Sequence, residues 1–298
     1  MSAPGDHAPD LGPPPEVQPP TVDRLIALLD VERLDRDLFR AAVPDRTQTD
    51  RLFGGQVAAQ TLRAATLTVD VDHHPHSLHG YFLRPGSPKV PIVLRVDRIR
   101  DGRSFTTRTV VAMQDGEAIF ELTASFHKDE PGAEYQTPLP AGVPDPEADF
   151  VWHESLLSRF DAASPFEMRE VPPPGPDERG LLSSTRRVWL RTRGALPDDR
   201  ALHACVLTFI SDMGAVFAAA LAVGGGFGLT MGASLDHAMW FHRPIRPDEW
   251  MLFDLRPASN AGARGLVHGT MHTRDGVLGA SIAQEALIRA LPRPRGDS

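Results

Sequence analysis

The chain has 298 residues, 41% of them hydrophobic, and a formal net charge of −8. This length and composition are typical of a folded protein with enough chain for two domains of ordinary size. The acidic balance excludes general binding of nucleic acids, because a surface that binds phosphates needs a basic field. An anionic ligand would therefore have to meet a local group of arginines.

The cysteine content and the two chain ends bear on the compartment. Cys205 is the only cysteine, which excludes an internal disulfide and any site built on paired cysteines. The first residues lack the basic and apolar regions of a signal peptide, and Arg295–Ser298 is not a peroxisomal targeting signal. No uninterrupted apolar run of membrane-spanning length is recognised. We therefore expect a soluble cytoplasmic protein that binds neither membranes nor nucleic acids.

The first half of the chain is predicted to be a helix followed by an antiparallel meander. Residues 1–20 are rich in proline and are interpreted as a disordered tail. A short helix is predicted over roughly 21–30, with Thr21 as its cap, and the alanine-rich stretch Gln56–Leu67 predicts a second one. Alternating apolar residues separated by Asp-Gly turns then predict four strands, at 76–83, 90–100, 104–114 and 117–128.

The second half follows a linker at 129–164, which is expected to include a short helix at about 151–160. A strand is predicted at Arg186–Arg193. Asp198–Val223 is predicted to be one long helix, because apolar residues recur there at steps of three or four, and the glycines at 224–226 are interpreted as its end. Further strands are predicted at 234–243, 250–257, 264–273 and 277–289, before a tail at 291–298.

The sequence motifs of residues 78–126 recur in residues 237–286. Arg84-Pro85 recurs 159 residues later as Arg243-Pro244, and the Asp-Gly turn at 115 recurs 160 residues later at 275. Helix followed by strands, twice, predicts a duplicated α+β protein with repeats at 21–128 and 165–290, in which each antiparallel sheet wraps its own long helix. Pairing of the two sheets with each other would remove two exposed edges.

Two polar residues of the second repeat fall on faces that are otherwise apolar. Gln284 lies on the strand face of Leu278 and Ile282, at the position where the first repeat has Ala124. A buried amide without partners costs roughly 1–3 kcal/mol, so Gln284 is expected to be hydrogen-bonded.

Asp212 shares the helix face of Phe209 and Val216, and its repeat counterpart is Gly55. A buried carboxylate must be paired, hydrogen-bonded or in contact with a wet pocket. The alternative is that Asp212 is an ordinary exposed residue of the helix surface.

The strand that begins at Ser234 carries further polar residues. Gly232–Asp236 lacks the final glycine and the following helix of a serine-hydrolase nucleophile elbow, so Ser234 taken alone is interpreted as a strand-start hydroxyl bonded to backbone. Asp236 and His237 alternate onto opposite faces, which excludes a dyad between them, and both are expected to make structural hydrogen bonds.

The histidines of the first repeat are interpreted without a metal. His73, His74 and His76 have no acidic or cysteine partner at ligand spacing, so a solvated turn is expected there. His79 corresponds to Ala238 in the repeat and is a candidate contact for a ligand.

These residues also carry a resemblance. Residues from about 22 to 290 resemble the acyl-CoA thioesterase II family, the double-hotdog thioesterases, through Phe53-Gly54-Gly55-Gln56, Ser211-Asp212, the run from Leu235 to Pro244, the stretch 81–86, and Arg274-Asp275-Gly276 leading to Gln284. The resemblance implies a double-hotdog fold. In this family an Asp, a Thr or Ser, and a Gln orient a hydrolytic water, and these fall on Asp212, Ser234 and Gln284.

The expected reaction is therefore hydrolysis of a medium- or long-chain fatty acyl-CoA to the free acid and CoA, without a covalent intermediate, a cofactor or a metal. Gly54, Gly55 and Gln56 begin a helix, so their backbone N–H groups are candidates to stabilise the developing oxyanion. Candidate contacts for the CoA head group are Arg84, Arg243, Arg246 and Arg264. By analogy with this fold, a homo-oligomer (dimer or tetramer) is expected.

Two other functions remain open from the sequence. A double-hotdog enoyl-CoA hydratase would have a histidine in the turn that follows its aspartate, and Asp212 has none there. A non-catalytic acyl-CoA-binding protein would keep the fold without needing the three polar residues.

Overall fold

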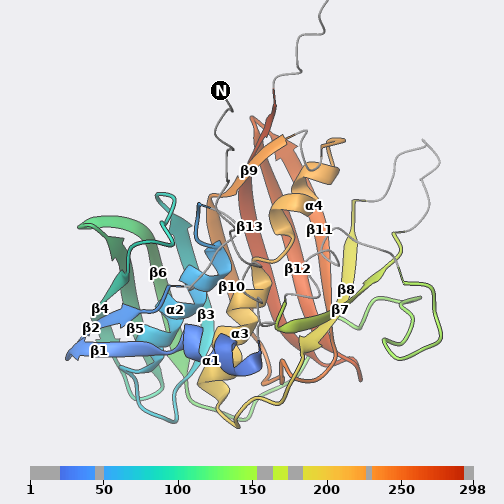
Figure 1. Ribbon diagram of the computed structural model, residues 1–298. Coiled ribbons are helices and arrows are strands. Elements are labelled where there is room, and N and C mark those ends of the chain that lie inside the picture. The colour runs from blue at the N-terminus through green and yellow to red at the C-terminus, as the bar shows by residue number, and fades with distance from the viewer. Residues whose placement is uncertain (1–20, 44–49, 153–163, 174–183, 226–229, 292–298) are drawn as a thin grey trace, which may run out of the picture.

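The computed structural model describes residues 21–43, 50–152, 164–173, 184–225 and 230–291. The tail predicted at 1–20, nearly all of the tail at 291–298, and all but two residues of the helix expected at 151–160 lie outside these ranges. The described residues form a single antiparallel sheet of thirteen strands, with the helices lying against it (Figure 1).

The first half confirms the helix-then-meander prediction, with each predicted boundary within two residues. Its elements are α1 (Val22–Leu29), β1 (Val31–Asp35), β2 (Leu38–Ala41), α2 (Gly54–Thr66), β3 (His74–Phe82), β4 (Ile92–Asp101), β5 (Phe105–Gln114) and β6 (Glu117–His127). Thr21 caps α1 as predicted, because its side chain accepts a hydrogen bond from the Arg24 backbone N–H at 3.4 Å. The β1–β2 hairpin was not predicted.

The second half contains β7 (Phe166–Val171), β8 (Arg186–Thr192), α3 (Arg200–Ser211), α4 (Ala215–Leu221), β9 (Thr230–Ser234), β10 (Asp236–Phe241), β11 (Met251–Ala261), β12 (Arg264–Thr273) and β13 (Leu278–Ala290). β7 was missed, and it falls just after the predicted linker. The strand predicted at 234–243 is instead two short strands, β9 and β10, that meet at Leu235.

The prediction of one continuous helix over 198–223 is wrong. α3 ends at Ser211, Asp212 is its C-cap, and α4 begins only at Ala215. Gly214 has a φ of +90°, a left-handed conformation that glycine adopts without the strain that a Cβ would cause. Apolar residues keep their steps of three or four on both sides of this break, so their spacing alone did not reveal it.

The stretch Arg200–Leu221 is long and apolar enough, by length and composition alone, to cross a membrane. It is not an uninterrupted apolar run, because it contains His203 and Asp212. Moreover, 67% of its most apolar 18-residue window is buried inside the protein. Such burial, together with the break at Gly214, is typical of the core helix of a folded domain.

The two halves of the sheet join through β3 and β10. The strand order is β1-β2-β4-β5-β6-β3-β10-β13-β12-β11-β8-β7, and β9 pairs with β13 beside this path. Ala238 pairs with His79, its own repeat counterpart. The local twofold axis of the duplication therefore passes through this pair, and the predicted joining of the two sheets is confirmed.

Each half of the sheet has its own helix on the same face (Figure 1). α2 contacts β3 to β6 in the first half, and α4 contacts β9, β11, β12 and β13 in the second. α3 packs on α2 and reaches β3 and β10, so it covers the junction between the halves. The duplicated α+β architecture is thus confirmed, with a helix in the second half that is interrupted.

Adjacent residues at the junction test this arrangement. Leu78 is fully buried beneath the helices, whereas His79 lies on the exposed face. We expect Leu78→Ala to lower the free energy of unfolding by about 2–5 kcal/mol, because the surrounding side chains cannot completely fill the cavity that the substitution leaves. The matched change His79→Ala should alter it by roughly 0.5 kcal/mol or less. Urea unfolding measures both, and equal effects would contradict the assigned faces.

Candidate functional site

A β-bulge brings Ser234 and His237 to the same side of the sheet. Ser234 pairs with Ala286 of β13 and Ala238 pairs with Ala283, so the register slips by one residue at Leu235. Strict alternation would have placed Ser234 and His237 on opposite faces, and a one-residue slip reverses that. Both side chains therefore reach Gln284.

Asp212, Ser234 and Gln284 form one hydrogen-bonded cluster. The Gln284 Nε2 donates to Asp212 Oδ1 and to Ser234 Oγ, each at 2.7 Å. The Ser234 hydroxyl in turn donates to Asp212 Oδ1 at 3.0 Å. The three residues that the sequence comparison brought together are thus in direct contact, from the end of α3, the end of β9 and the middle of β13.

The start of α2 lies against the same carboxylate. The Gly55 backbone N–H donates to Asp212, and a Cβ at position 54 would lie 2.7 Å from Asp212 Oδ2 and 2.9 Å from the Phe82 ring. At position 55, a Cβ would collide with the backbone carbonyl of Phe209. Glycines at 54 and 55 therefore let the helix N-terminus, with its positive dipole end, approach Asp212.

His237 extends the cluster on the far side of Gln284. Its Nδ1 lies 2.8 Å from Gln284 Oε1, and its Nε2 lies 2.7 Å from Ser211 Oγ. The ionised carboxylate of Asp212 can only accept, so the Gln284 amide presents its NH₂ to Asp212 and its oxygen to His237. That oxygen in turn requires a proton on His237 Nδ1.

These groups are buried, and burial sets their charge states. The exposed fraction is 7% for Asp212 and 1% each for His237 and Gln284. Burial raises the pKa of the Asp212 carboxyl, and His237, Gln284, Ser234 and Gly55 oppose this without reversing it. Burial also lowers the pKa of His237, which keeps its ring neutral at neutral pH.

The neutral ring fixes the remaining hydrogen bond. With its proton on Nδ1, His237 has an acceptor at Nε2 for the Ser211 hydroxyl. Ser211 follows Thr208 by three residues on α3, and the Thr208 carbonyl is a second acceptor for the same hydroxyl, at 2.8 Å. The chain of hydrogen bonds thus runs from α3 through His237 and Gln284 to Asp212.

Several candidates from the sequence lie elsewhere. Gln56 is buried in α2 and donates to Gln60 at 3.4 Å rather than to Asp212. His79 lies on the exposed face of the sheet with its ring against Trp240. Arg264 also faces away, because it pairs with Leu287, three positions from the pairing of Gln284, and it binds Glu285. Within the described residues, no hydrogen bond joins these three side chains to Asp212, Ser234 or Gln284. Gln56 was expected to act through its backbone N–H, which lies in the first turn of α2.

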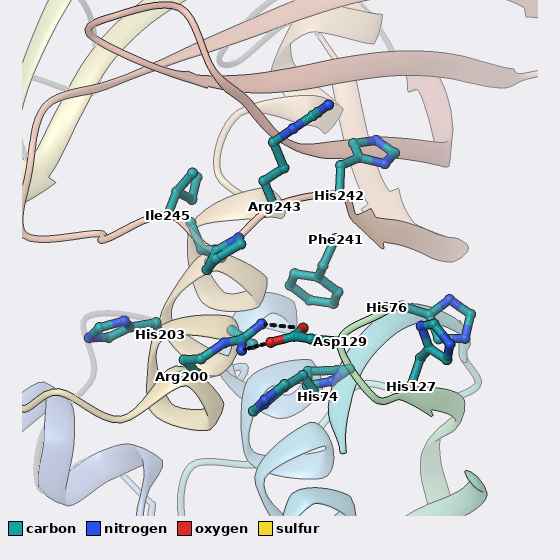
Figure 2. A pocket seen from close by; sticks show the side chains of 14 residues that line it. His74, His76, His127, Asp129, Arg200, His203, Phe241, His242, Arg243 and Ile245 are labelled. Carbon is teal, nitrogen blue, oxygen red and sulfur yellow. Dashed lines mark hydrogen bonds and ion pairs between the residues drawn. The ribbon is translucent and has the colours of Figure 1, made fainter. Parts of the chain in front are cut away.

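The other arginines proposed for the CoA head group each have an acidic partner. Arg84 pairs with Glu117 and Arg246 pairs with Asp248. Arg243 pairs with Glu134 and lines a separate pocket at the other end of α3 (Figure 2). Within the described residues, no hydrogen bond or ion pair joins any of them to Asp212.

Asp236 is not a member of the cluster. It accepts a hydrogen bond from the Glu285 backbone N–H at 2.7 Å, which closes the gap that the bulge leaves in the ladder. Its predicted structural role is confirmed. His237 also makes the structural hydrogen bonds expected of it, to Gln284 and Ser211. That Gln284 is one of its partners was not predicted, because strict alternation does not detect the bulge at Leu235.

The histidine run at 73–76 does have acidic neighbours, contrary to expectation. Potential ligand atoms of Asp70, Asp72 and His73 lie within 4.8 Å of one another. Asp72, however, is already bound to Lys128 at 2.7 Å and to His73 at 2.9 Å. Both aspartates are exposed, as expected for a solvated turn.

Comparisons with known proteins place this chain in a family. Residues 43–127 match the acyl-CoA thioesterase N-terminal domain family, and residues 163–287 match the acyl-CoA thioesterase family. Acyl-coenzyme A thioesterase 8 of Mus musculus is 40% identical over 287 residues, which cover 90% of this chain and 89% of the mouse protein. Acyl-CoA thioesterase 2 of Haemophilus influenzae is 35% identical over 90% of this chain and 98% of its own length.

Solved structures agree with the fold. The acyl-CoA thioesterase II TesB2 of Mycobacterium marinum is 39% identical with a TM-score of 0.76, covering 91% of this chain and 98% of that protein. A hot dog fold protein from Alicyclobacillus acidocaldarius, 21% identical with a TM-score of 0.73 over 89% of this chain and 98% of its own, shares the architecture. With relatives of 35–40% identity along nine-tenths of its length, the chain belongs to the acyl-CoA thioesterase II family and is an acyl-CoA thioesterase with a double-hotdog α+β fold.

Proposed function

We propose that the chain hydrolyses acyl-CoA thioesters with a water molecule that is activated by Asp212, Ser234 and Gln284. The observation that carries this proposal is the convergence of a hydroxyl and an amide on one oxygen of a buried carboxylate. The raised pKa of Asp212 also supports it, because a general base works best when its pKa lies near the working pH.

In this mechanism the water oxygen attacks the thioester carbonyl while Asp212 takes one of its protons. Asp212 Oδ1 already accepts from both Ser234 and Gln284, so the second oxygen, Oδ2, is the one we assign to the water. Collapse of the tetrahedral intermediate breaks the carbon–sulfur bond. The CoA thiolate leaves and takes up a proton, and the fatty acid carries the water oxygen.

The developing oxyanion needs donors that are in place before the reaction. We assign this role to backbone N–H groups at the start of α2, because the first N–H groups of a helix have no acceptor within it. Gly54 lies next to Asp212 Oδ2, so a carbonyl attacked by the water would be close to this helix end. The Gly55 N–H itself is directed to Asp212.

A covalent acyl-enzyme is not part of this mechanism. Within the described part of the chain, no histidine is hydrogen-bonded to Ser234. Ser211 does contact His237, but it is fully buried and so cannot meet a substrate carbonyl. Burial raises the pKa of the Cys205 thiol to about 12, which leaves it protonated at neutral pH.

A fatty acyl chain of medium or long length is the substrate that we propose for this site. Aromatic rings surround the start of α2, since Phe53 packs edge-on against Phe209 at 5.0 Å and Phe82 borders Gly54. Such surfaces favour an apolar chain. Hydrolysis rates for acyl-CoA esters of increasing length test this part, and a preference for short acyl groups would contradict it.

We also propose that the chain forms a homo-oligomer in the cytoplasm. Tyr81 and its repeat counterpart Trp240 are 63% and 36% exposed on the sheet face opposite the helices. Large apolar side chains on one exposed surface favour contact with another protein. Light scattering of the purified protein measures the assembly, and a monomer at micromolar concentration would contradict it.

Replacing Asp212 tests the base directly. Asp212→Asn keeps the size of the side chain and removes the proton acceptor, so kcat should fall about 10²–10⁴-fold. Release of free thiol from an acyl-CoA measures this. Thermal unfolding serves as the control that the variant is folded, and near-wild-type turnover would end the assignment.

The pH profile tests the same group independently. Asp212 must be ionised to accept a proton, and its pKa lies above the ordinary value of 3.8. As the pH falls through this raised pKa, kcat/KM should decrease, at a pH where an ordinary aspartate is still ionised. The residual activity of Asp212→Asn should lack this acidic limb. A wild-type profile that stays flat down to about pH 4 would exclude Asp212 as the base.

His237 is expected to act by positioning Gln284, and two variants distinguish the roles of its two ring nitrogens, Nδ1 and Nε2. Asparagine at 237 can place an NH₂ near the position of Nδ1, whereas glutamine places its polar group near Nε2. Leaving Gln284 Oε1 without a buried donor costs about 1–3 kcal/mol, so His237→Gln should lower kcat about 10- to 100-fold. His237→Asn should retain more of it. The opposite order would show that the Ser211 contact matters more.

A further inference from the structure

A pocket of about 220 Å³ lies at the N-terminal end of α3 (Figure 2). Two arginines and five histidines line it, and Asp129 is the one acid among its fourteen lining residues. Burial lowers the pKa of His74, His76 and His242, so these rings are neutral hydrogen-bonding groups and the positive charge comes from the two arginines. In a chain with a net charge of −8, such a pair of arginines is what an anionic ligand requires.

The pocket is the repeat counterpart of the surroundings of Ser234. Pro75 lines the pocket and pairs with Phe126 of β6. Ser234 pairs in the same way with Ala286 of β13, which lies 160 residues after Phe126. Phe241 and Arg243 of the pocket correspond to Phe82 and Arg84 at the other end of β3. Because Phe82 borders Gly54 beside Asp212, the twofold axis of the duplication relates Pro75 and Phe241 of this pocket to Ser234 and Phe82 at the catalytic site.

The chemistry of hydrolysis is missing from this counterpart. Pro75 occupies the position of Ser234 and cannot hold water, and the lining contains no glutamine. Its one acid, Asp129, is bound to Arg200. The pocket can therefore bind a ligand of the same class without cleaving it.

We propose that this pocket binds the phosphorylated nucleotide end of a second CoA molecule. Its volume is below the roughly 300 Å³ at which pockets for drug-sized ligands begin, so it accommodates one end of the molecule rather than all of it. The inference uses the substrate class of the family and is independent of the roles proposed for Asp212, Ser234 and Gln284.

The two arginines can exchange their present partners for a phosphate. Arg200 binds Asp129 through two hydrogen bonds of 2.6 and 3.1 Å, and Arg243 binds Glu134 at 3.2 Å. The acids are 74% and 80% exposed, and ion pairs this exposed contribute little to stability. A guanidinium binds phosphate oxygens with two parallel hydrogen bonds, which makes a phosphate the stronger partner.

Figure 2 shows the arrangement around Phe241. The Arg200–Asp129 pair lies below the Phe241 ring next to His74, and Arg243 and His242 lie above it. His76 and His127 stand together to one side. Phe241 thus provides an apolar surface for a nucleotide base between two groups of cationic or hydrogen-bonding side chains.

This pocket and the Asp212 cluster are distinct sites. Arg200 and Ser211 are the first and last residues of α3, which places them roughly 17 Å apart along the helix axis. α3 itself packs over β3 and β10 between them. A second CoA molecule would therefore bind at the same time as the substrate.

Equilibrium dialysis with free CoA tests the proposal. We expect two CoA molecules per wild-type chain and one per chain of the Arg200→Gln/Arg243→Gln variant, whose affinity at the second site should fall at least tenfold. Arg40→Gln is the matched control, because Arg40 is an exposed arginine paired with Glu32 on β1, away from the pocket. If the double variant does not fold, Arg200→Gln alone makes the same test.

Adding competitors identifies the part of CoA that is recognised. Excess ADP should occupy the second site of the wild type, whereas pantetheine, which has no phosphate, should not. One CoA per wild-type chain, two per double variant, or competition by pantetheine instead of ADP would each overturn the proposal. A failure of the proposed hydrolytic mechanism would appear in the turnover of Asp212→Asn and not in these stoichiometries.

Discussion

The carboxylate of Asp212 lies at 7% exposure between the two halves of the molecule, where it can stay charged only if hydrogen-bond donors replace water. Those donors come from three separate elements: the backbone of Gly55 at the start of α2, Ser234 at the end of β9, and Gln284 on β13. The first half of the chain therefore contributes a backbone dipole to a side-chain cluster that belongs to the second half.

The same carboxylate orders the groups behind it. Because it can only accept, it determines which way the Gln284 amide faces, and the amide oxygen then determines which nitrogen of His237 carries the proton. Ser211 completes this line at the last turn of α3. One charge thus fixes the orientation of successive neutral groups, and the break at Gly214 is what allows the helix to end beside it.

Sequence patterns predicted most of the strands, both repeats and the two side chains, Asp212 and Gln284, that stand on apolar faces. They did so because burial imposes a period that can be counted along the chain. The errors arose where one residue interrupts a period. The bulge at Leu235 reverses the side of the sheet that Ser234 faces, and Gly214 divides a helix whose apolar spacing is continuous. Alternation also does not tell which face of a strand the helices cover, which is why His79 and Arg264 were misplaced.

The pairing of β3 with β10 has an evolutionary consequence. Two separate copies of a single-repeat protein could form the same junction, but every substitution would then change both halves at once. Covalent fusion of the copies removes this restriction, so each half can accumulate its own substitutions. Proline at 75 and serine at 234 illustrate the result: positions related by symmetry have been free to specialise, one for packing and one for polar contact.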